Sequence, residues 1–99
     1  EERSWGEYTV VNLSFDGAES LTVTNKKLIR AVKKIVQTKH ERHLEVWTIL
    51  SGRAVISIKG RKHDALAGDT FTIECKVPHS LAAVEDTVLL EVQIEGAKD

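Results

Sequence analysis

The sequence predicts an all-β protein, a sandwich or barrel of short strands. Apolar and polar residues alternate with a period of two along most of the chain from residue 44 onward, as they do on half-buried strands. Turn signals separate these runs at Ser51-Gly52, Lys59-Gly60-Arg61 and Ala67-Gly68-Asp69. Short strands at such regular spacing are typical of all-β domains, and hairpins are the simplest connections between them.

The strand predicted at residues 44–50 is apolar on both faces. Its side chains divide into Leu44, Val46 and Leu50 on one face, and Trp47 and Ile49 beside Glu45 on the other. Because both faces need cover, we expect one to look into a barrel and the other to meet a second sheet or a second subunit. The pattern therefore favours a homodimer.

Three further strands follow from the same period of two, within residues 53–59, 69–75 and 87–95. The side chains that share one face are, in turn, Ala54, Ile56 and Ile58; Phe71, Ile73 and Cys75; and Val88, Leu90, Val92 and Ile94. We expect Cys75 to be a buried structural thiol on this apolar face.

Residues 26–37 fit two structures. Helical spacing relates Leu28, Ala31, Val32, Ile35 and Val36, with Lys and Arg on the opposite side. The β-branched residues and the position among strands favour a strand instead, with Ile29 facing outward. We predict a strand here, and a loop from Asn12 to Ser20.

Composition excludes several classes of partner. Lys and Arg number 14 against 15 Asp and Glu, a formal net charge of -1, and neither sign forms a block that would attract nucleic acid. No apolar run is long enough for a transmembrane helix, and no signal-peptide pattern is present, so we expect no membrane partner. The single cysteine, Cys75, precludes an internal disulfide and favours a reducing compartment, which we take to be the cytoplasm.

The 99 residues are the length of one domain, which we place at 1–99. The chain opens at Glu1 without an initiator Met, which is compatible with an excerpt from a longer protein.

Two glycines lie at characteristic distances from possible ligands. Glu45 is followed by six residues and then Gly52, whereas Gly68 is followed by five residues, Glu74, and later His79. These spacings resemble the two motifs of the cupin superfamily.

The flanking sequence is similar to the C-terminal cupin domain of type II mannose-6-phosphate isomerases. The similar segments are Arg3-Ser4-Trp5-Gly6-Glu7-Tyr8, Glu45-Val46-Trp47 with Ser51-Gly52, and Val77-Pro78-His79 followed by Leu81. This resemblance covers roughly Arg3 to Gln93. It implies a cupin double-stranded β-helix, or jelly-roll barrel, with a divalent metal inside and a small sugar phosphate as substrate.

In the family, two histidines and a glutamate of the first motif and a histidine of the second hold the metal. Glu45 and His79 carry over to these positions directly. The second motif departs elsewhere, because Glu74, Lys76 and Ala83 stand where the family tends to have Pro, Gly and Asn.

The histidine pair of the first motif can be placed in two registers. Counting back from the tryptophan of the EVW run puts His40 and Arg42 at these positions. Counting forward from Gln37 puts Lys39 and Glu41 there instead. Neither register restores the pair, and an arginine stays protonated and cannot ligate.

The candidate metal ligands are therefore His40, His43, Glu45 and His79. A catalytic Zn²⁺ needs three protein ligands and an open position, and imidazole with carboxylate suits it, so zinc is the expected metal. On an extended strand His43 and Glu45 share a face while His40 points the other way. All three meet only if the chain bulges between them.

The first function hypothesis is aldose–ketose isomerisation of a phosphorylated sugar. It needs a Lewis acid on the carbonyl, a base to move a proton between neighbouring carbons, and a cation for the phosphate. We expect the base at Glu41 or Glu74 and the phosphate at Arg42 or Lys76. Trp47 is either a stacking surface for the sugar or a core residue.

Two other hypotheses remain open. The barrel could bind a sugar or nucleotide sugar without turnover, with a degenerate metal site in which Glu45 pairs with Arg42 or Lys76 and the histidines are solvated. A third hypothesis is a small iron-dependent oxygenase, because cupin sites also host oxygen chemistry on histidine and carboxylate ligands.

Overall fold

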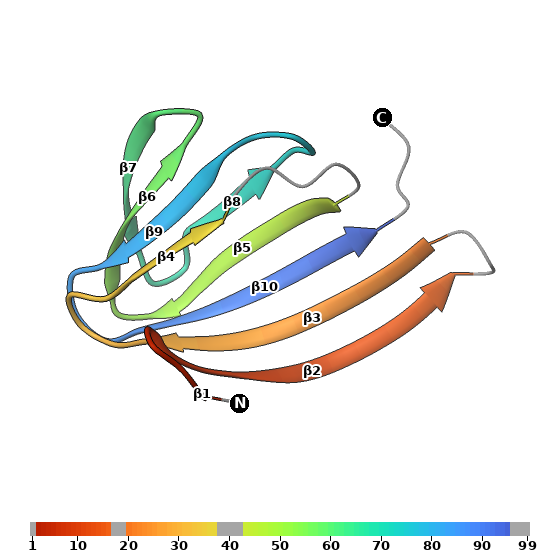
Figure 1. The fold of residues 1–99 in the computed structure, drawn as a ribbon, viewed down its shortest axis with the longest axis horizontal. Helices are drawn as coiled ribbons and strands as arrows, with labels where there is room; N and C mark the ends of the chain where they lie inside the picture. The colour runs from red at the N-terminus through yellow and green to blue at the C-terminus, as the bar shows by residue number, and fades with distance from the viewer. Residues whose placement is uncertain (1, 17–19, 38–42, 96–99) are drawn as a thin grey trace.

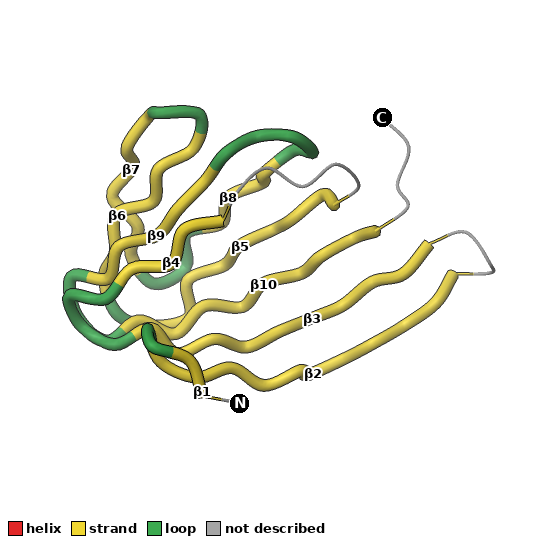
Figure 2. Tube along the Cα trace, viewed as in Figure 1, coloured by secondary structure: helices red, strands yellow, loops and turns green. Residues whose placement is uncertain are grey.

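In the computed structural model the described residues are 2–16, 20–37 and 43–95, with the side chains at 12–16, 20, 21, 36, 37, 43 and 95 left outside the description. These residues form strands and turns, and no helix occurs among them (Figure 2). The all-β prediction is confirmed. The described part of the chain also contains no helix with the length and hydropathy that crossing a membrane requires.

Two antiparallel sheets face each other (Figure 1). The larger sheet has the order β1 (Glu2–Arg3), β2 (Gly6–Asp16), β3 (Ser20–Ile29), β10 (Thr87–Glu95), β5 (His43–Ser51) and β8 (Thr70–Ile73). The smaller sheet has the order β4 (Lys34–Gln37), β9 (His79–Ala83), β6 (Arg53–Ile58) and β7 (Arg61–Leu66). This is the arrangement of a jelly-roll barrel.

Several connections cross from one sheet to the other. Of the three predicted turns, only the one at Lys59-Gly60 closes a hairpin, which joins β6 and β7. The turns at Ser51-Gly52 and Ala67-Gly68-Asp69 join strands of different sheets, so the hairpin prediction was wrong there. These crossings hold the sheets together as one barrel.

The apolar core lies between the two sheets. It consists of Ile29, Ile35, Trp47, Ile49, Ala54, Ile56, Ala65, Ile73, Leu81, Ala83 and Leu89. The period of two correctly assigned Trp47, Ile49, Ala54, Ile56 and Ile73 to strand faces that pack together. Burial of such side chains, at roughly 1.5–3 kcal/mol each, is the main favourable contribution to folding.

Residues 26–37 are strands, as predicted, but a turn divides them. β3 ends at Ile29 and β4 begins at Lys34. Ile29 is fully buried, so the expectation that it faces outward was wrong. The predicted loop from Asn12 to Ser20 was also wrong, because residues 12–16 continue β2 and pair with β3; residues 17–19 lie outside the described part.

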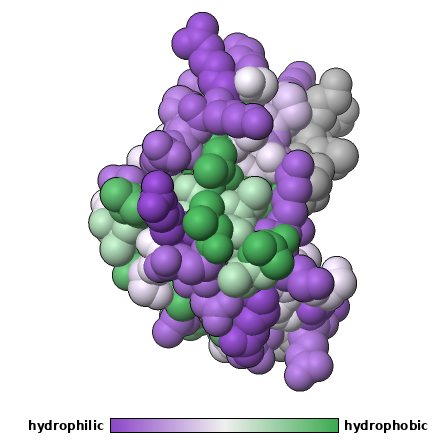
Figure 3. All heavy atoms as spheres, turned by 90° about the vertical axis from the view of Figure 1, so that its left-hand side faces the viewer, coloured by the Kyte–Doolittle hydropathy of each residue, from purple (hydrophilic) through white to green (hydrophobic). Residues whose placement is uncertain are grey.

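The turn between β3 and β4 is held by Asp86. Its carboxylate accepts a hydrogen bond from the Ala31 amide (2.7 Å) and pairs with the Arg30 guanidinium at 3.4 Å. Val32, at φ 57°, is 87% exposed in this turn, and the β9–β10 turn adds the exposed Val84. Figure 3 shows apolar side chains gathered on this end of the molecule.

The β5–β6 turn sets a testable requirement for glycine. Gly52 has φ 93°, and a Cβ there would overlap the carbonyl oxygen of Asp86 and lie 2.7 Å from the Cα of Thr87. We expect Gly52→Ala to lower the free energy of unfolding by about 2–4 kcal/mol, measured by urea denaturation. Gly60→Ala is the control, because Gly60 has φ 81° and open space around its Cβ position.

The control should lose only about 1 kcal/mol, the cost of the left-handed conformation. Equal losses in the two variants would contradict this account of the β5–β6 turn.

Candidate functional site

Glu45 and His79 meet inside the barrel from opposite sheets. Glu45 is the third residue of β5 and His79 the first residue of β9, and both strands begin at the same end of the barrel (Figure 1). The His79 Nε2 lies 3.3 Å from the Glu45 Oε2, and the two side chains are each 1% exposed. The structure thus brings together the two residues, Glu45 and His79, that the motif spacings predict as metal ligands.

Neighbouring groups fix the orientation of this pair. The His79 Nδ1 lies 2.8 Å from the Val77 carbonyl oxygen, so an Nδ1–H donates to it and leaves Nε2 directed at the carboxylate. The Trp47 Nε1–H donates to the Glu45 Oε1 at 2.9 Å. The Trp47 ring also packs edge-on to the imidazole, with centroids 5.1 Å apart. Trp47, Glu45 and His79 therefore form one packed unit.

The turn between β8 and β9 explains how His79 reaches this place. Lys76 has φ 66°, a left-handed conformation that favours glycine. This is the position at which the resemblance to the cupin motif leads one to expect glycine. Lys76 therefore adopts a backbone conformation that is more strained for lysine than it would be for glycine.

A second buried ion pair lies beside the first. The Lys27 Nζ is 2.9 Å from the Glu91 Oε2, and Glu91 is fully buried. The Glu91 Oε1 accepts hydrogen bonds from the Asn25 Nδ2 (3.3 Å) and the Gln93 Nε2 (2.7 Å). Glu91 and Gln93 face the barrel interior from β10, next to Trp47 and Glu45 in register.

This second group was not predicted from the sequence. The signal was available in TVLLEVQIE, where Glu91 and Gln93 occupy the face opposite Val88, Leu90, Val92 and Ile94. We had no reason from the pattern alone to place that polar face inward. Lys27 lies in a run of basic residues whose spacing also fits a helix, so the pattern does not distinguish it from its neighbours.

Each partner shifts the pKa of the other in the Glu45–His79 pair. Burial by itself would raise the pKa of Glu45, but hydrogen bonds from His79 and Trp47 and the charge of His79 lower it to about 2. Burial by itself would lower the pKa of His79, but the hydrogen bonds to Glu45 and to the Val77 carbonyl, with the charges of Glu45 and Glu91, raise it above its ordinary value. The pair is therefore stabilised in its ionic form.

The donor chemistry of Glu45 and His79 fits two ligands of a divalent metal. A ligating imidazole commonly donates its other N–H to a backbone carbonyl, as His79 does to Val77. Across residues 2–16, 20–37 and 43–95, no group of three or more His, Cys, Asp or Glu side chains could hold a metal ion. A third ligand would have to be a side chain that the structure does not describe, and the predicted ligands His40 and His43 are of this kind.

The other predicted site residues divide into two groups. Glu74 and Lys76 are exposed in the turn after β8, so the structure does not bring them to the Glu45–His79 pair. Trp47 is fully buried, which fits the core alternative and leaves no ring face for a sugar. His40, Glu41 and Arg42 lie outside the described residues, as does the side chain of His43.

Comparison with known proteins gives the same fold. The family model for the cupin domain matches residues 32–93. An RmlC-like cupin from Shewanella frigidimarina is 17% identical, with a TM-score of 0.69 over 89% of this chain and 86% of that one. No curated protein sequence matches significantly.

Two solved structures whose names describe enzymes are also similar to this chain. A proposed sugar phosphate isomerase from Acidithiobacillus ferrooxidans has 17% identity and a TM-score of 0.67, over 76% of this chain and 55% of that one. A salicylate 1,2-dioxygenase from Pseudaminobacter salicylatoxidans has 22% identity and a TM-score of 0.68, over 73% of this chain and 20% of that one. At these identities the similarities show the shared fold alone.

The pKa shifts predict how stability depends on pH. Ionised Glu45, whose pKa falls from 4.5 to about 2, adds stability above pH 4.5 that is lost as the pH drops toward 2. Protonated His79, whose pKa is raised from 6.5, adds stability below pH 6.5 that is lost as the pH rises through the raised value. We expect urea denaturation of wild type and Glu45→Gln to give the largest difference in the free energy of unfolding, about 3 kcal/mol, between pH 4.5 and pH 6.5. A difference that does not change with pH would contradict the pairing.

Proposed function

The chain belongs to the cupin family, and on that premise we propose that it is a metal-dependent isomerase of a phosphorylated sugar. The observation that supports this is the buried pair of Glu45 and His79, with Nε2 and Oε2 3.3 Å apart at one end of the barrel. Both residues occupy the positions at which the cupin motifs supply metal ligands. The reaction would take place at this end.

The two ligands would act in a prearranged setting. Glu45 and His79 would hold a divalent metal, which supplies a Lewis acid for the sugar carbonyl when it is bound. Trp47 fixes one carboxylate oxygen of Glu45, and the Val77 carbonyl fixes the imidazole, so neither side chain has to reorganise. The surrounding apolar core would keep water from the ligands.

The remaining roles fall to the segment that leads into β5. Since Glu74 is exposed in the β8–β9 turn, we assign the base to Glu41 and the phosphate contact to Arg42. His40 or His43 would complete the metal ligands. All four precede Glu45 by at most five residues, which places them within reach of it along the chain.

A second candidate function is sugar or nucleotide-sugar binding without turnover. It is favoured by the direct contact of His79 with Glu45, because an ion pair compensates the two charges without a metal. The Lys27–Glu91 pair likewise leaves a neutral barrel interior. In this case the polar interior would serve stability, and the ligand would bind at the mouth.

Metal content separates the two candidates. We expect protein purified without chelator or histidine tag, then dialysed against Zn²⁺, Mn²⁺, Fe²⁺, Co²⁺ or Ni²⁺, to hold about one ion per chain by elemental analysis. His79→Ala should hold less than about a tenth of that amount, because it lacks one of three ligands. His63→Ala, at an exposed histidine of β7, is the matched control and should keep the metal.

Turnover is then measured with mannose 6-phosphate and its ketose isomer by NMR. Isomerisation that needs the metal and is lost in His79→Ala would support the first candidate. Metal-free protein that also fails to take up any of these ions would contradict it. Heat of binding with mannose 6-phosphate or GDP-mannose, in the absence of turnover, would then support the second candidate.

A further inference from the structure

The inner face of the larger sheet is polar next to Glu45. Strand pairing places the inward side chains of β3, β10 and β5 in rows across the sheet, and one of these rows contains Gln93 and Glu45. The next row, further into the barrel, contains Asn25, Glu91 and Trp47. Polar side chains therefore continue from the candidate metal ligand Glu45 onto β10 and β3.

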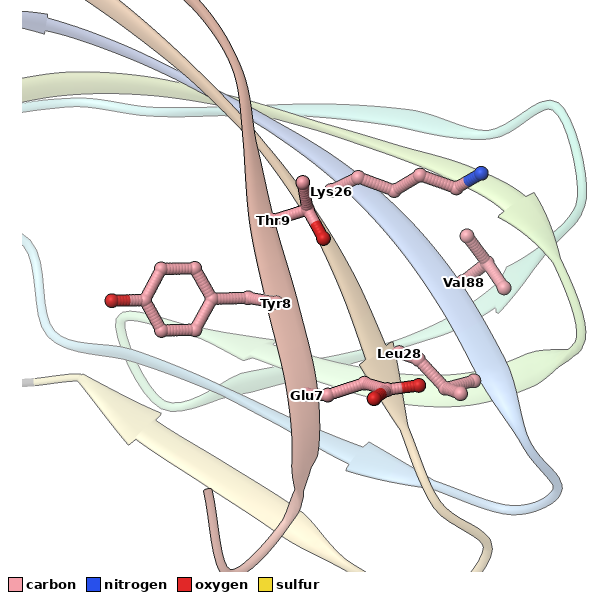
Figure 4. Close-up of a pocket in the computed structure, with 6 residues that line it drawn as sticks. All are labelled: Glu7, Tyr8, Thr9, Lys26, Leu28 and Val88. Carbon is pink, nitrogen blue, oxygen red and sulfur yellow. The ribbon is translucent and has the colours of Figure 1, made fainter. Parts of the chain in front are cut away.

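The polar residues of β3 in these rows point into the barrel. Figure 4 shows Lys26 and Leu28 on one side of the sheet and Tyr8 on the opposite side. Tyr8 pairs with Lys27 in register, and Asn25 lies two residues away on the same face of β3. Asn25 and Lys27 are only 8% and 7% exposed, so both side chains belong to the interior of the protein.

Glu91 is the common hydrogen-bond acceptor of this group. Its Oε1 accepts hydrogen bonds from the Asn25 Nδ2 (3.3 Å) and the Gln93 Nε2 (2.7 Å), and its Oε2 accepts one from the Lys27 Nζ (2.9 Å). These bonds fix both amide groups, because a flipped amide would place its oxygen against the carboxylate. The carbonyl oxygens of Asn25 and Gln93 are consequently turned away from Glu91.

The carbonyl oxygen of Asn25 is a buried acceptor that lacks a donor. Within the described residues no hydrogen bond reaches its Oδ1, and the atom is shielded from solvent. A buried polar atom without a hydrogen bond destabilises the folded protein, and an apolar side chain in its place would avoid this cost. An amide at this position is therefore explained best by a donor that a bound molecule supplies.

The way to Asn25 is from the end of the barrel at which Glu45 and His79 lie. β3, β5 and β9 begin at this end, and β10 ends there (Figure 1). On β10, Gln93 is half-buried whereas Glu91, one inward position further along the barrel, is fully buried. A ligand that enters beside Glu45 therefore meets Gln93 first, and a movement of this side chain uncovers Asn25.

We propose that Asn25 and Gln93 bind hydroxyl groups of the sugar, with the Asn25 Oδ1 accepting a hydrogen bond from one of them. This assignment rests on the proposed sugar-binding function and adds residues that select among sugars. The Lys27–Glu91 and His79–Glu45 pairs already balance their charges, so a phosphate buried beside them would add an uncompensated charge. A hydroxyl supplies the missing donor without a charge, and the phosphate stays nearer the mouth of the barrel.

Asn25→Leu replaces the amide by an apolar group of similar size. Calorimetry should give a dissociation constant for mannose 6-phosphate at least about 10-fold higher than that of wild type, because a buried hydrogen bond to the ligand is lost. The melting temperature should stay within about 5 °C of wild type, since the substitution removes an unsatisfied acceptor together with the long hydrogen bond to Glu91. Thr24→Val, at the next residue of β3 and on its outer side, is the matched control and should bind as wild type does.

Monodeoxy analogues of mannose 6-phosphate test the same contact from the side of the ligand. Removal of the hydroxyl that Asn25 binds should weaken binding to wild type at least about 10-fold, because the buried acceptor is then left unpaired. Asn25→Leu should bind this analogue within about threefold of the parent sugar phosphate. A purely structural role of Asn25 would instead weaken the binding of both ligands equally.

The possible results separate this assignment from the proposed function. The assignment is overturned if Asn25→Leu binds mannose 6-phosphate as tightly as wild type, if it weakens the parent and all analogues equally, or if Thr24→Val shows the same loss. These results leave the proposed function intact, because wild type still binds the sugar phosphate. Absence of any heat from wild type with mannose 6-phosphate and with GDP-mannose would overturn the assignment and the proposed function together.

Discussion

A buried carboxylate needs a cation beside it, and this requirement organises the interior of the barrel. Glu45 faces His79, and Glu91 faces Lys27, each pair joining strands that are distant in the sequence. Removing either cation would leave an uncompensated charge in the core, at a cost of roughly 3–5 kcal/mol. The first pair joins the two sheets, whereas the second joins neighbouring strands of one sheet. Together they constrain β3, β5, β9 and β10.

The same constraint connects the interior of the protein with its outer surface. On β10, Leu89, Glu91 and Gln93 face inward, and the alternation of the strand places Val88, Leu90, Val92 and Ile94 on the outside. The polar residues beside the candidate site and the aliphatic residues of the outer surface are two faces of β10, and a shift of its register by one residue would exchange them.

Much of the fold could be predicted from the sequence, because alternation and turn residues are local properties. They predict the strands at 44–50, 53–59 and 87–95, and the motif spacing singled out Glu45 and His79, which the structure places in contact. Which turns close hairpins depends on how the sheets pack, and local sequence patterns carry no information about sheet packing. The pairing of Lys27 with Glu91 depends on contacts 64 residues apart, so composition and periodicity could not reveal it. Ile29 was misassigned because strand pairing, rather than its neighbours, decides which face is buried.

The contact of His79 with Glu45 inside the barrel is the feature on which the candidate site depends most directly. The measurement that tests this is a pH titration of the His79 ring nitrogens by ¹⁵N NMR, in wild type and in Glu45→Gln. We predict a proton on Nδ1 in the neutral form, a pKa above the ordinary value in wild type, and a fall of that pKa in the variant. An ordinary His79 pKa that Glu45→Gln leaves unchanged would contradict the pairing, and with it the assignment of the site.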